Sequence, residues 1–204
     1  MSSKASPKPR IIVGISGASG IAYGIEALKA LRRLDVETHL VVSKAAQVTL
    51  SQESTLSFAE LKALADVQHS NSDIGAPVAS GSYQTMGMLI APCSIKTLSE
   101  IASGVTSSLL SRAADVVLKE RRRLVLMVRE TPLHAGHLES MLKVTHMGAI
   151  VSPPVPAFYT GPETIEDLVQ QSVGRVLDLF ELESGMVNRW AGNQPRQQSK
   201  KGTE

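Results

Sequence analysis

Short apolar runs alternate with segments of helical periodicity along most of this chain. Runs typical of buried strands occupy residues 11–15, 36–42, 67–69, 86–91, 124–128 and 149–151. Between them, apolar residues recur every three or four positions, as at Ile21, Ile25 and Leu28, which predicts amphipathic helices. This alternation predicts an α/β fold of three layers, in which helices cover both faces of a mostly parallel central sheet. Ligands of such sheets bind at the carboxyl ends of the strands, near the point where the strand order switches.

The ends of the predicted helices carry recognisable signals. Helices are expected over residues 21–35, from 44 onward, and over 58–65, 95–102, 107–122, 138–146 and 164–182. Ser57 and Thr164 begin capping-box patterns, and Gly104 suits a helix C-cap. Residues 70–82 have the composition of a loop, and Pro92 is expected to end its strand because it lacks an N–H group.

The composition indicates one soluble globular domain. Of the 204 residues, 43% are hydrophobic, and 21 basic against 19 acidic side chains give a formal net charge of +2. Cys93 is the single cysteine, so no disulfide framework can form within one chain, and a reducing, cytoplasmic setting is expected. We expect a single domain over residues 10–191, with flexible tails at 1–9 and 192–204 that are poor in apolar residues.

Several classes of function are disfavoured. No segment reaches the ~18 apolar residues of a membrane span, and the polar start is unlike a signal peptide. Basic residues form no long run, and three Tyr, three Phe and one Trp leave few platforms for base stacking, so nucleic acid is not an expected partner. His134 and His137 lack the spacing and third ligand of a metal site, and no metal is expected. Cys93 is either a nucleophile or a small buried residue. The sequence also lacks the GxSxG motif that would support a Ser-His-Asp catalytic triad.

A glycine-rich loop follows the first predicted strand. Gly14, Gly17 and Gly20 surround small residues and Ser19 at the start of a helix, where free backbone N–H groups bind anions. The spacing matches neither the dinucleotide fingerprint nor a P-loop, and a tight glycine turn without a ligand is the alternative. After the second strand, Ser43 stands where a nicotinamide enzyme carries an acidic residue, which favours a ligand with phosphate or hydroxyl groups over NAD.

Other predicted strands also end in polar side chains. The loop that begins at Ser94 brings hydroxyl groups to the start of a helix, although ordinary N-capping explains Ser94 equally well. Arg129 and Glu130 deliver a cation and a carboxylate to the same rim, with a surface ion pair as the alternative. Arg112 and Lys119 share one face of a helix, where they are either solvated or able to hold a phosphate.

Six segments together carry a resemblance to a known family. They are GISGASGIAYG, VVSKAAQVTLSQE, ASGSYQTMGMLIAPCSIKTL, SRAADVVLKERR, VRETPLHAGHLESMLK and PAFYTGPETIEDLV. These segments resemble the UbiX-like flavin prenyltransferases, a family that includes the small subunits named phenolic or phenylacrylic acid decarboxylases. The resemblance covers nearly all of residues 10–191, and its motifs occur in order.

The resemblance implies a fold, a reaction and partners. The fold is Rossmann-like or flavodoxin-like, and the assembly is a homo-oligomer, typically a dodecamer, with FMN bound where subunits meet. The reaction transfers a dimethylallyl group from dimethylallyl monophosphate to N5 and then C6 of reduced FMN, without a metal ion. The prenylated FMN is the cofactor of UbiD-type decarboxylases.

The resemblance also assigns roles to individual residues. The flavin-binding residues it implies are Gly17, Ala18, Ser19, Ser43, Ser94, Ile95, Lys96, Thr97 and Arg129. The expected catalytic residues are Glu130, which transfers the proton, together with Ser19 and Glu53. The residues that match the grip on the substrate phosphate are Arg112, Lys119, Tyr159 and Arg175. Tyr159 and Trp190 are also candidate walls of the prenyl pocket, because aromatic residues are scarce.

Two alternatives share parts of this pattern. A flavin-dependent cysteine decarboxylase has a similar fold and loop, but it needs a histidine after the second strand, and residues 43–54 contain none. An FMN-binding accessory subunit of a hydroxyaryl acid decarboxylase would bind FMN yet be indifferent to dimethylallyl phosphate. The sequence also differs from the pattern common in the family at Ser140, where Asn is frequent. No role is assigned to this position.

Overall fold

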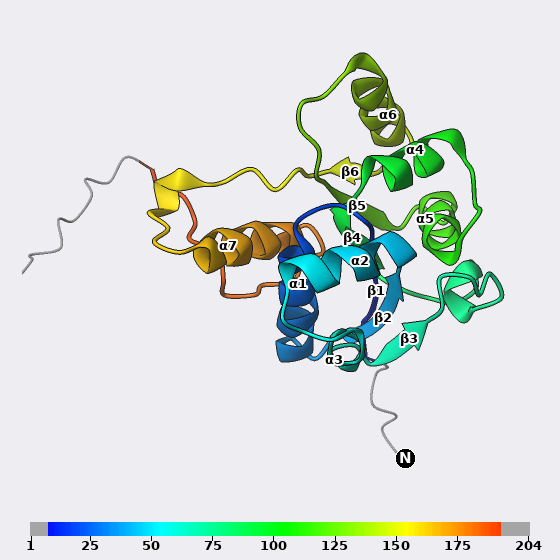
Figure 1. Cartoon of the computed structure of the whole chain (residues 1–204), viewed down its shortest axis with the longest axis horizontal. Helices are drawn as coiled ribbons and strands as arrows, with labels where there is room; N and C mark the ends of the chain where they lie inside the picture. Colours follow the sequence, from blue (N-terminus) through cyan, green and yellow to red (C-terminus); the bar gives the residue numbers. More distant parts are fainter. Residues whose placement is uncertain (1–7, 193–204) are drawn as a thin grey trace, which may run out of the picture.

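A central parallel sheet organises the chain, of which the computed structural model describes residues 8–192. Its strands are β1 (Arg10–Ile15), β2 (Glu37–Val42), β3 (Val67–His69), β4 (Gly87–Cys93), β5 (Arg123–Val128) and β6 (Ile150–Val151). They lie in the order β3-β2-β1-β4-β5-β6, and each described pairing is parallel (Figure 1). This is the strand order of Rossmann-type sheets. The tails expected at 1–9 and 192–204 lie almost wholly outside the described residues.

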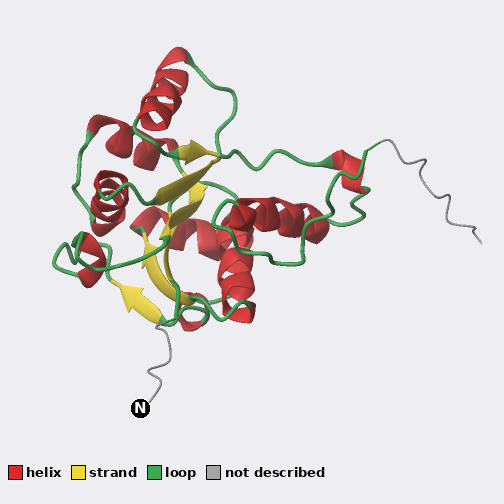
Figure 2. Ribbon diagram, turned by 180° about the vertical axis from the view of Figure 1, so that it is seen from behind, coloured by secondary structure: helices red, strands yellow, loops and turns green. Residues whose placement is uncertain are grey.

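Helices cover both faces of the sheet (Figure 2). One layer contains α1 (Ile21–Arg33), α2 (Lys44–Glu53), α3 (Phe58–Ala63) and α7 (Ile165–Asp178). The other contains α4 (Ile95–Ser103), α5 (Leu109–Lys119) and α6 (Ala135–His146). Two single 3₁₀ turns complete the described elements, η1 (Pro77–Ala79) and η2 (Phe158–Thr160). The predicted three-layer α/β fold is therefore confirmed.

The side chains of each strand point alternately to the two helical layers. On β1, Ile11 and Val13 belong to the cluster that includes α1 and α7, whereas Ile12 belongs to the cluster that includes α4 and α5. All seven residues of β4 are buried, because this central strand has helices on both faces. The core thus consists of two apolar layers on either side of the sheet.

The structure confirms the helix signals and corrects several boundaries, among them the start of α6, which lies at Ala135 rather than at residue 138. Both capping boxes are present, and Gly104 ends α4 in the left-handed region with φ of 72°. The prediction that Pro92 ends its strand is wrong: the pairing register shifts after Ile90, and β4 continues to Cys93, which pairs with β5. α5 is shorter than predicted because Ser108 caps its start, and α7 ends at Asp178 rather than at residue 182.

Two features of this topology position the functional residues. The strand order switches between β1 and β4, so the loops after these strands diverge at the carboxyl edge of the sheet. An arm, residues 152–164, leaves the body after β6, passes through η2 and returns to α7 (Figures 1 and 2). The arm carries Tyr159 away from the sheet edge.

Candidate functional site

Hydrogen bonds join the loops at the switch point. The Ser16 N–H donates to Pro92 O at 3.2 Å, and the Ser16 hydroxyl donates to the same oxygen at 3.0 Å. The same hydroxyl oxygen accepts from the Ser94 N–H at 2.7 Å. The Arg129 N–H donates to Cys93 O at 3.1 Å, which ties the end of β5 to the same corner. Ser16 is a site residue that the sequence analysis missed; its signal was a hydroxyl directly after a buried strand.

A cavity of about 770 Å³ opens at this edge of the sheet, a volume in the range of small-molecule sites. Of the predicted flavin residues, it is lined by Gly17, Ser43, Ser94, Lys96 and Thr97. It also contains residues that the sequence analysis did not single out, including Lys44, Phe58, Lys62, His69 and Asn71. Ala18, Ser19, Ile95 and Arg129 are not among its lining residues, and the Ile95 side chain packs against the core cluster under α4. The cavity therefore gathers five of the nine predicted flavin residues.

Gly17 is needed for the shape of the cavity wall. A Cβ atom at this position would lie 2.2 Å from the Cβ of Ala45. The glycine loop can therefore approach the first turn of α2 only because residue 17 has no side chain.

The cavity is suited to an anion. Ser43 caps α2 by accepting from the Ala46 N–H at 3.1 Å, and Ser94 caps α4 by accepting from the Thr97 N–H at 3.3 Å. Ordinary capping is thus confirmed, yet both caps also line the cavity, where the positive ends of two helix dipoles meet. Among its described lining residues, Glu100 is the one carboxylate, and it pairs with Lys96 at 2.8 Å.

The start of α1 already holds a carboxylate. Glu53 Oε2 accepts from the Gly20 N–H at 2.8 Å and from the Ile21 N–H at 3.1 Å. The prediction of free N–H groups is therefore wrong for Gly20 and Ile21. Partial burial raises the pKa of Glu53, but hydrogen bonds from Ser19, Gly20 and Ile21, with the charge of Arg129, bring it below its ordinary value. Glu53 is consequently an anion at neutral pH.

Arg129 and Glu130 extend from the carboxyl end of β5 as exposed side chains. The ion pair considered as an alternative does not form, since Glu130 Oε1 instead accepts from the Thr131 N–H at 3.0 Å. Arg129 acts electrostatically on Glu53 and on Tyr23, where burial raises the pKa of the phenol and the nearby guanidinium partly offsets this. Arg129, Glu53 and Ser19 thus form one charged cluster beside the glycine loop.

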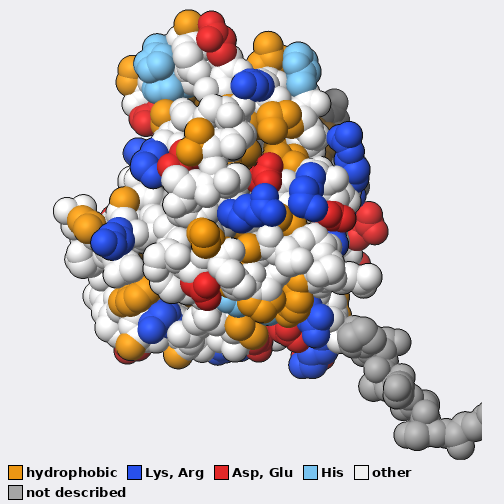
Figure 3. All heavy atoms as spheres, turned by 90° about the vertical axis from the view of Figure 1, so that its right-hand side faces the viewer, with side chains coloured by type: hydrophobic (Ala, Val, Ile, Leu, Met, Phe, Trp, Pro, Cys, Tyr) orange, Lys and Arg blue, Asp and Glu red, His pale blue; other side chains and the backbone are white. Residues whose placement is uncertain are grey.

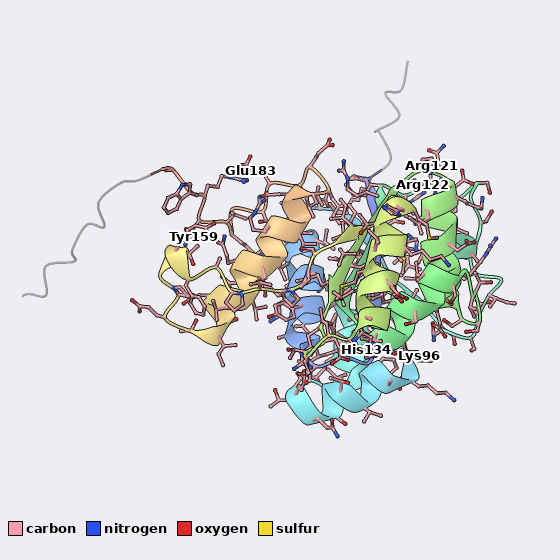
Figure 4. All side chains as sticks on the ribbon, turned by 90° about the horizontal axis from the view of Figure 1, so that it is seen from above. Lys96, Arg121, Arg122, His134, Tyr159 and Glu183 are labelled. Carbon is pink, nitrogen blue, oxygen red and sulfur yellow. The ribbon has the colours of Figure 1, made fainter. Side chains whose placement is uncertain are left out.

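The four residues predicted to grip a phosphate are not brought together within one chain. On α5, Arg112 pairs with Asp115 at 2.8 Å, and Lys119 pairs with Glu120. Basic and acidic side chains are interspersed on the face seen from that side (Figure 3). Tyr159 lies on the arm, on the opposite side of the molecule from α5 (Figures 1 and 4). Arg175 lies on α7 and pairs with Asp178.

A buried polar network around His39 of β2 reaches the cavity through His69 of β3. His39 is 2% exposed, and its Nδ1 lies 3.0 Å from Nε2 of His69, a cavity residue. Its Nε2 lies 2.9 Å from Glu37 Oε1 and 3.1 Å from the Tyr83 hydroxyl. The hydrogen bond from His39 holds the pKa of Glu37 below its ordinary value, so the ionised Glu37 carboxylate accepts from Nε2 of His39. The sequence analysis missed both histidines; His39 could have been noticed as a titratable residue inside an apolar strand.

Cys93 and His134 have structural roles in the fold. Cys93 is fully buried, which strongly raises the pKa of its thiol and makes it an unreactive small core residue. His134 caps α6 by accepting from the Gly136 N–H at 3.1 Å (Figure 4). Within residues 8–192, no three His, Cys, Asp or Glu side chains are grouped to hold a metal ion. Over the same range, every helix is too short or too polar to cross a membrane.

The fold, the glycine loop and the anion-binding cavity define the class of protein as an α/β flavoprotein, and the Flavoprotein family model matches residues 1–177. The flavin prenyltransferase UbiX of Thauera aromatica is 54% identical over 191 residues, which cover 94% of this chain and 98% of that protein. The chain belongs to the UbiX family of flavin prenyltransferases.

Two solved structures are similar over most of the chain. AnUbiX (PadA1), in complex with FMN and dimethylallyl pyrophosphate, has a TM-score of 0.91 and 54% identity, covering 92% of this chain and all of that one. A dodecameric FMN-dependent UbiX-like decarboxylase from Escherichia coli O157:H7 has a TM-score of 0.88 and 49% identity, covering 90% of this chain.

Proposed function

We propose that this protein transfers a dimethylallyl group from dimethylallyl monophosphate to N5 and C6 of reduced FMN. The observation that carries the proposal is the cluster of Ser19, Glu53 and Arg129 beside the glycine loop, whose Gly17 lines a cavity that also contains Lys44, Lys62 and Lys96. A flavin carrier needs the cavity but not an ionised carboxylate held beside its rim. The complex of AnUbiX with FMN and dimethylallyl pyrophosphate supports FMN and a dimethylallyl phosphate ester as the two ligands.

The described residues fit FMN. The N-terminal ends of α2 and α4, with the Ser43, Ser94 and Thr97 hydroxyls, would bind its phosphate. Gly17, Ala18 and Ser19 would also hold the flavin, and Arg129, at the end of β5, would supply a positive charge beside it. The reduced flavin supplies the nucleophilic nitrogen and carbon atoms of the reaction.

Three residues would handle protons. Glu130 is exposed at the rim and would accept the proton lost from N5 or C6, or deliver a proton to the departing phosphate. Glu53, an anion at neutral pH, holds Ser19 by a hydrogen bond. Ser19 would therefore hold or relay a proton beside the flavin.

Arg112, Lys119, Tyr159 and Arg175 would stabilise the leaving phosphate electrostatically. Because one chain keeps α5 and the arm apart, we infer that copies of the chain complete each site together, in a homo-oligomer like the dodecamer of the Escherichia coli O157:H7 relative. We further propose a cytoplasmic enzyme whose prenylated FMN is used by a UbiD-type decarboxylase.

The mass of the flavin released after anaerobic incubation tests this function. The protein is incubated with reduced FMN and either dimethylallyl monophosphate or the diphosphate. We expect the flavin to gain the mass of one five-carbon unit, and we expect this gain to be faster with the monophosphate than with the diphosphate. Unmodified FMN from folded, flavin-loaded protein with both donors would instead support the accessory-subunit alternative.

A further inference from the structure

The chain after α7 forms a strap, residues 183–190, that has no helix or strand of its own. It runs along α7 from Glu183 toward the end of the arm that carries Tyr159 (Figure 4). The contact is close at Gly174, where a Cβ atom would lie 2.8 Å from Val187 Cγ2 and 3.1 Å from Ser184 Oγ. A residue with a side chain at 174 would therefore push the strap off the helix.

Gln171 of α7 fixes the middle of the strap. Its side chain is 4% exposed, and its Oε1 accepts from the Asn188 N–H at 2.8 Å. Its Nε2 has no hydrogen-bond partner among the described residues. The Gln171 side chain thus gives the Asn188 N–H an acceptor, but its own buried Nε2 is left without a partner, which costs free energy. Packing alone would be better served by an apolar side chain, so the hydrogen bond to the strap is the distinctive property of Gln171.

The strap connects Gln171 to the residues of the proposed phosphate grip. The Tyr159 hydroxyl donates to Asn188 O at 3.4 Å, so Asn188 links α7 to the arm. Trp190 meets the Tyr159 ring edge to face, with ring centroids 5.6 Å apart. At its outer end, Arg189 forms two hydrogen bonds with Asp178, at 2.9 and 3.0 Å, and Asp178 also accepts from Arg175.

We propose that Gln171 is a positioning residue: by holding Asn188, it sets the strap so that Tyr159, Trp190 and Arg175 face the prenyl phosphate together. This inference rests on the proposed prenyltransferase function. It assigns Gln171 no contact with the substrate. Loss of its hydrogen bond should therefore weaken use of the prenyl phosphate while FMN binding at the distant cavity is retained.

Gln171→Leu tests this role, because leucine fills the site and removes the acceptor. We expect the KM for dimethylallyl monophosphate to rise about tenfold, with the Kd for FMN changed by less than about twofold. Trp190 is the single tryptophan of the chain, so its fluorescence emission reports the strap directly and should shift in this variant. Gln171→Glu keeps an acceptor, one helical turn before Arg175, and should restore the KM and the emission.

Gln170→Leu is the matched control, since Gln170 precedes Gln171 on α7 and its side chain makes no hydrogen bond to any described residue. It should leave the KM and the Trp190 emission unchanged. If Gln171→Leu does not fold, Asn188→Pro removes the same N–H donor from the exposed strap and should raise the KM in the same way.

The outcomes separate this inference from the function on which it rests. A wild-type protein that transfers no prenyl group overturns the proposed function, whether or not the Trp190 emission shifts in the variants. A wild-type protein that is active, with an unchanged KM and Trp190 emission in Gln171→Leu or Asn188→Pro, overturns the positioning role alone. An equal rise in KM for Gln170→Leu would also overturn it, because the effect would then belong to α7 in general.

Discussion

Glu53 illustrates how one side chain changes the chemistry of a motif. The glycine loop predicts an anion site at the start of α1, and the structure fills that place with a carboxylate from the end of α2. The N–H groups that favour an anion are the same ones that keep Glu53 ionised. An external phosphate is thereby directed to the neighbouring caps at Ser43 and Ser94, which line the cavity.

Glu53→Gln should make stability less dependent on pH. The pKa of folded Glu53 lies below its ordinary value of 4.5, so ionised Glu53 stabilises the fold above that pH, and this contribution is lost as the pH falls through the folded pKa. We expect the variant to be less stable by about 0.5–1 kcal/mol at pH 7 and nearly equal to the wild type under acid conditions. Urea unfolding at a series of pH values measures this. Glu139→Gln, an exposed carboxylate on α6, is the control, and an equal loss there would contradict the assignment.

At the scale of elements, local signals predicted where helices begin better than where strands and helices end. The capping boxes at Ser57 and Thr164 use hydrogen bonds within four residues, and both were predicted. The end of β4 depends on a partner: Cys93 remains in the sheet because it pairs with Val128 of β5. No property of the segment around Pro92 reveals that partner.

Ser43→Ala should separate the two roles of an N-cap. Removal of the Ser43 hydroxyl should cost about 1 kcal/mol of stability, because the Ala46 N–H loses its acceptor. It should also weaken FMN binding, since Ser43 lines the cavity. Thr164→Ala removes a comparable cap from α7, which contributes no residue to the cavity, and should cost similar stability with no change in FMN affinity. Denaturant unfolding and flavin titration of both variants provide the comparison. Equal FMN affinity in the two would remove Ser43 from the flavin site.

At the scale of the whole molecule, the predicted site is divided. Five of the nine predicted flavin residues line the cavity at the carboxyl edge of the sheet, whereas the predicted phosphate residues are distributed between α5, the arm and α7. The arm exposes Val155, Phe158 and Tyr159, apolar or aromatic side chains that a second copy of the chain could cover. Such a division is expected of a site that is completed by symmetry.

Mixed oligomers test whether the site is shared. Lys119→Ala and Tyr159→Phe should each weaken use of the prenyl phosphate when assayed alone. When the two variants assemble together, some sites receive an intact Lys119 from one chain and an intact Tyr159 from another, so activity should recover above either parent. Co-expression of two differently tagged variants, followed by purification through both tags, provides the sample. Mixed oligomers with no recovery would show that each chain needs both residues.

The sequence by itself determined the class of fold, the order of strands and helices along the chain, and five of the residues that line the cavity. These follow from apolar periodicity, caps and strand-end positions, which are properties of short segments. Only the tertiary structure decided that Glu53 occupies the start of α1, that the His39 and His69 rings meet between neighbouring strands, and that Gln171 holds the strap at Asn188. Each of these contacts joins residues more than ten positions apart, and no local pattern encodes which distant groups the packed chain brings together.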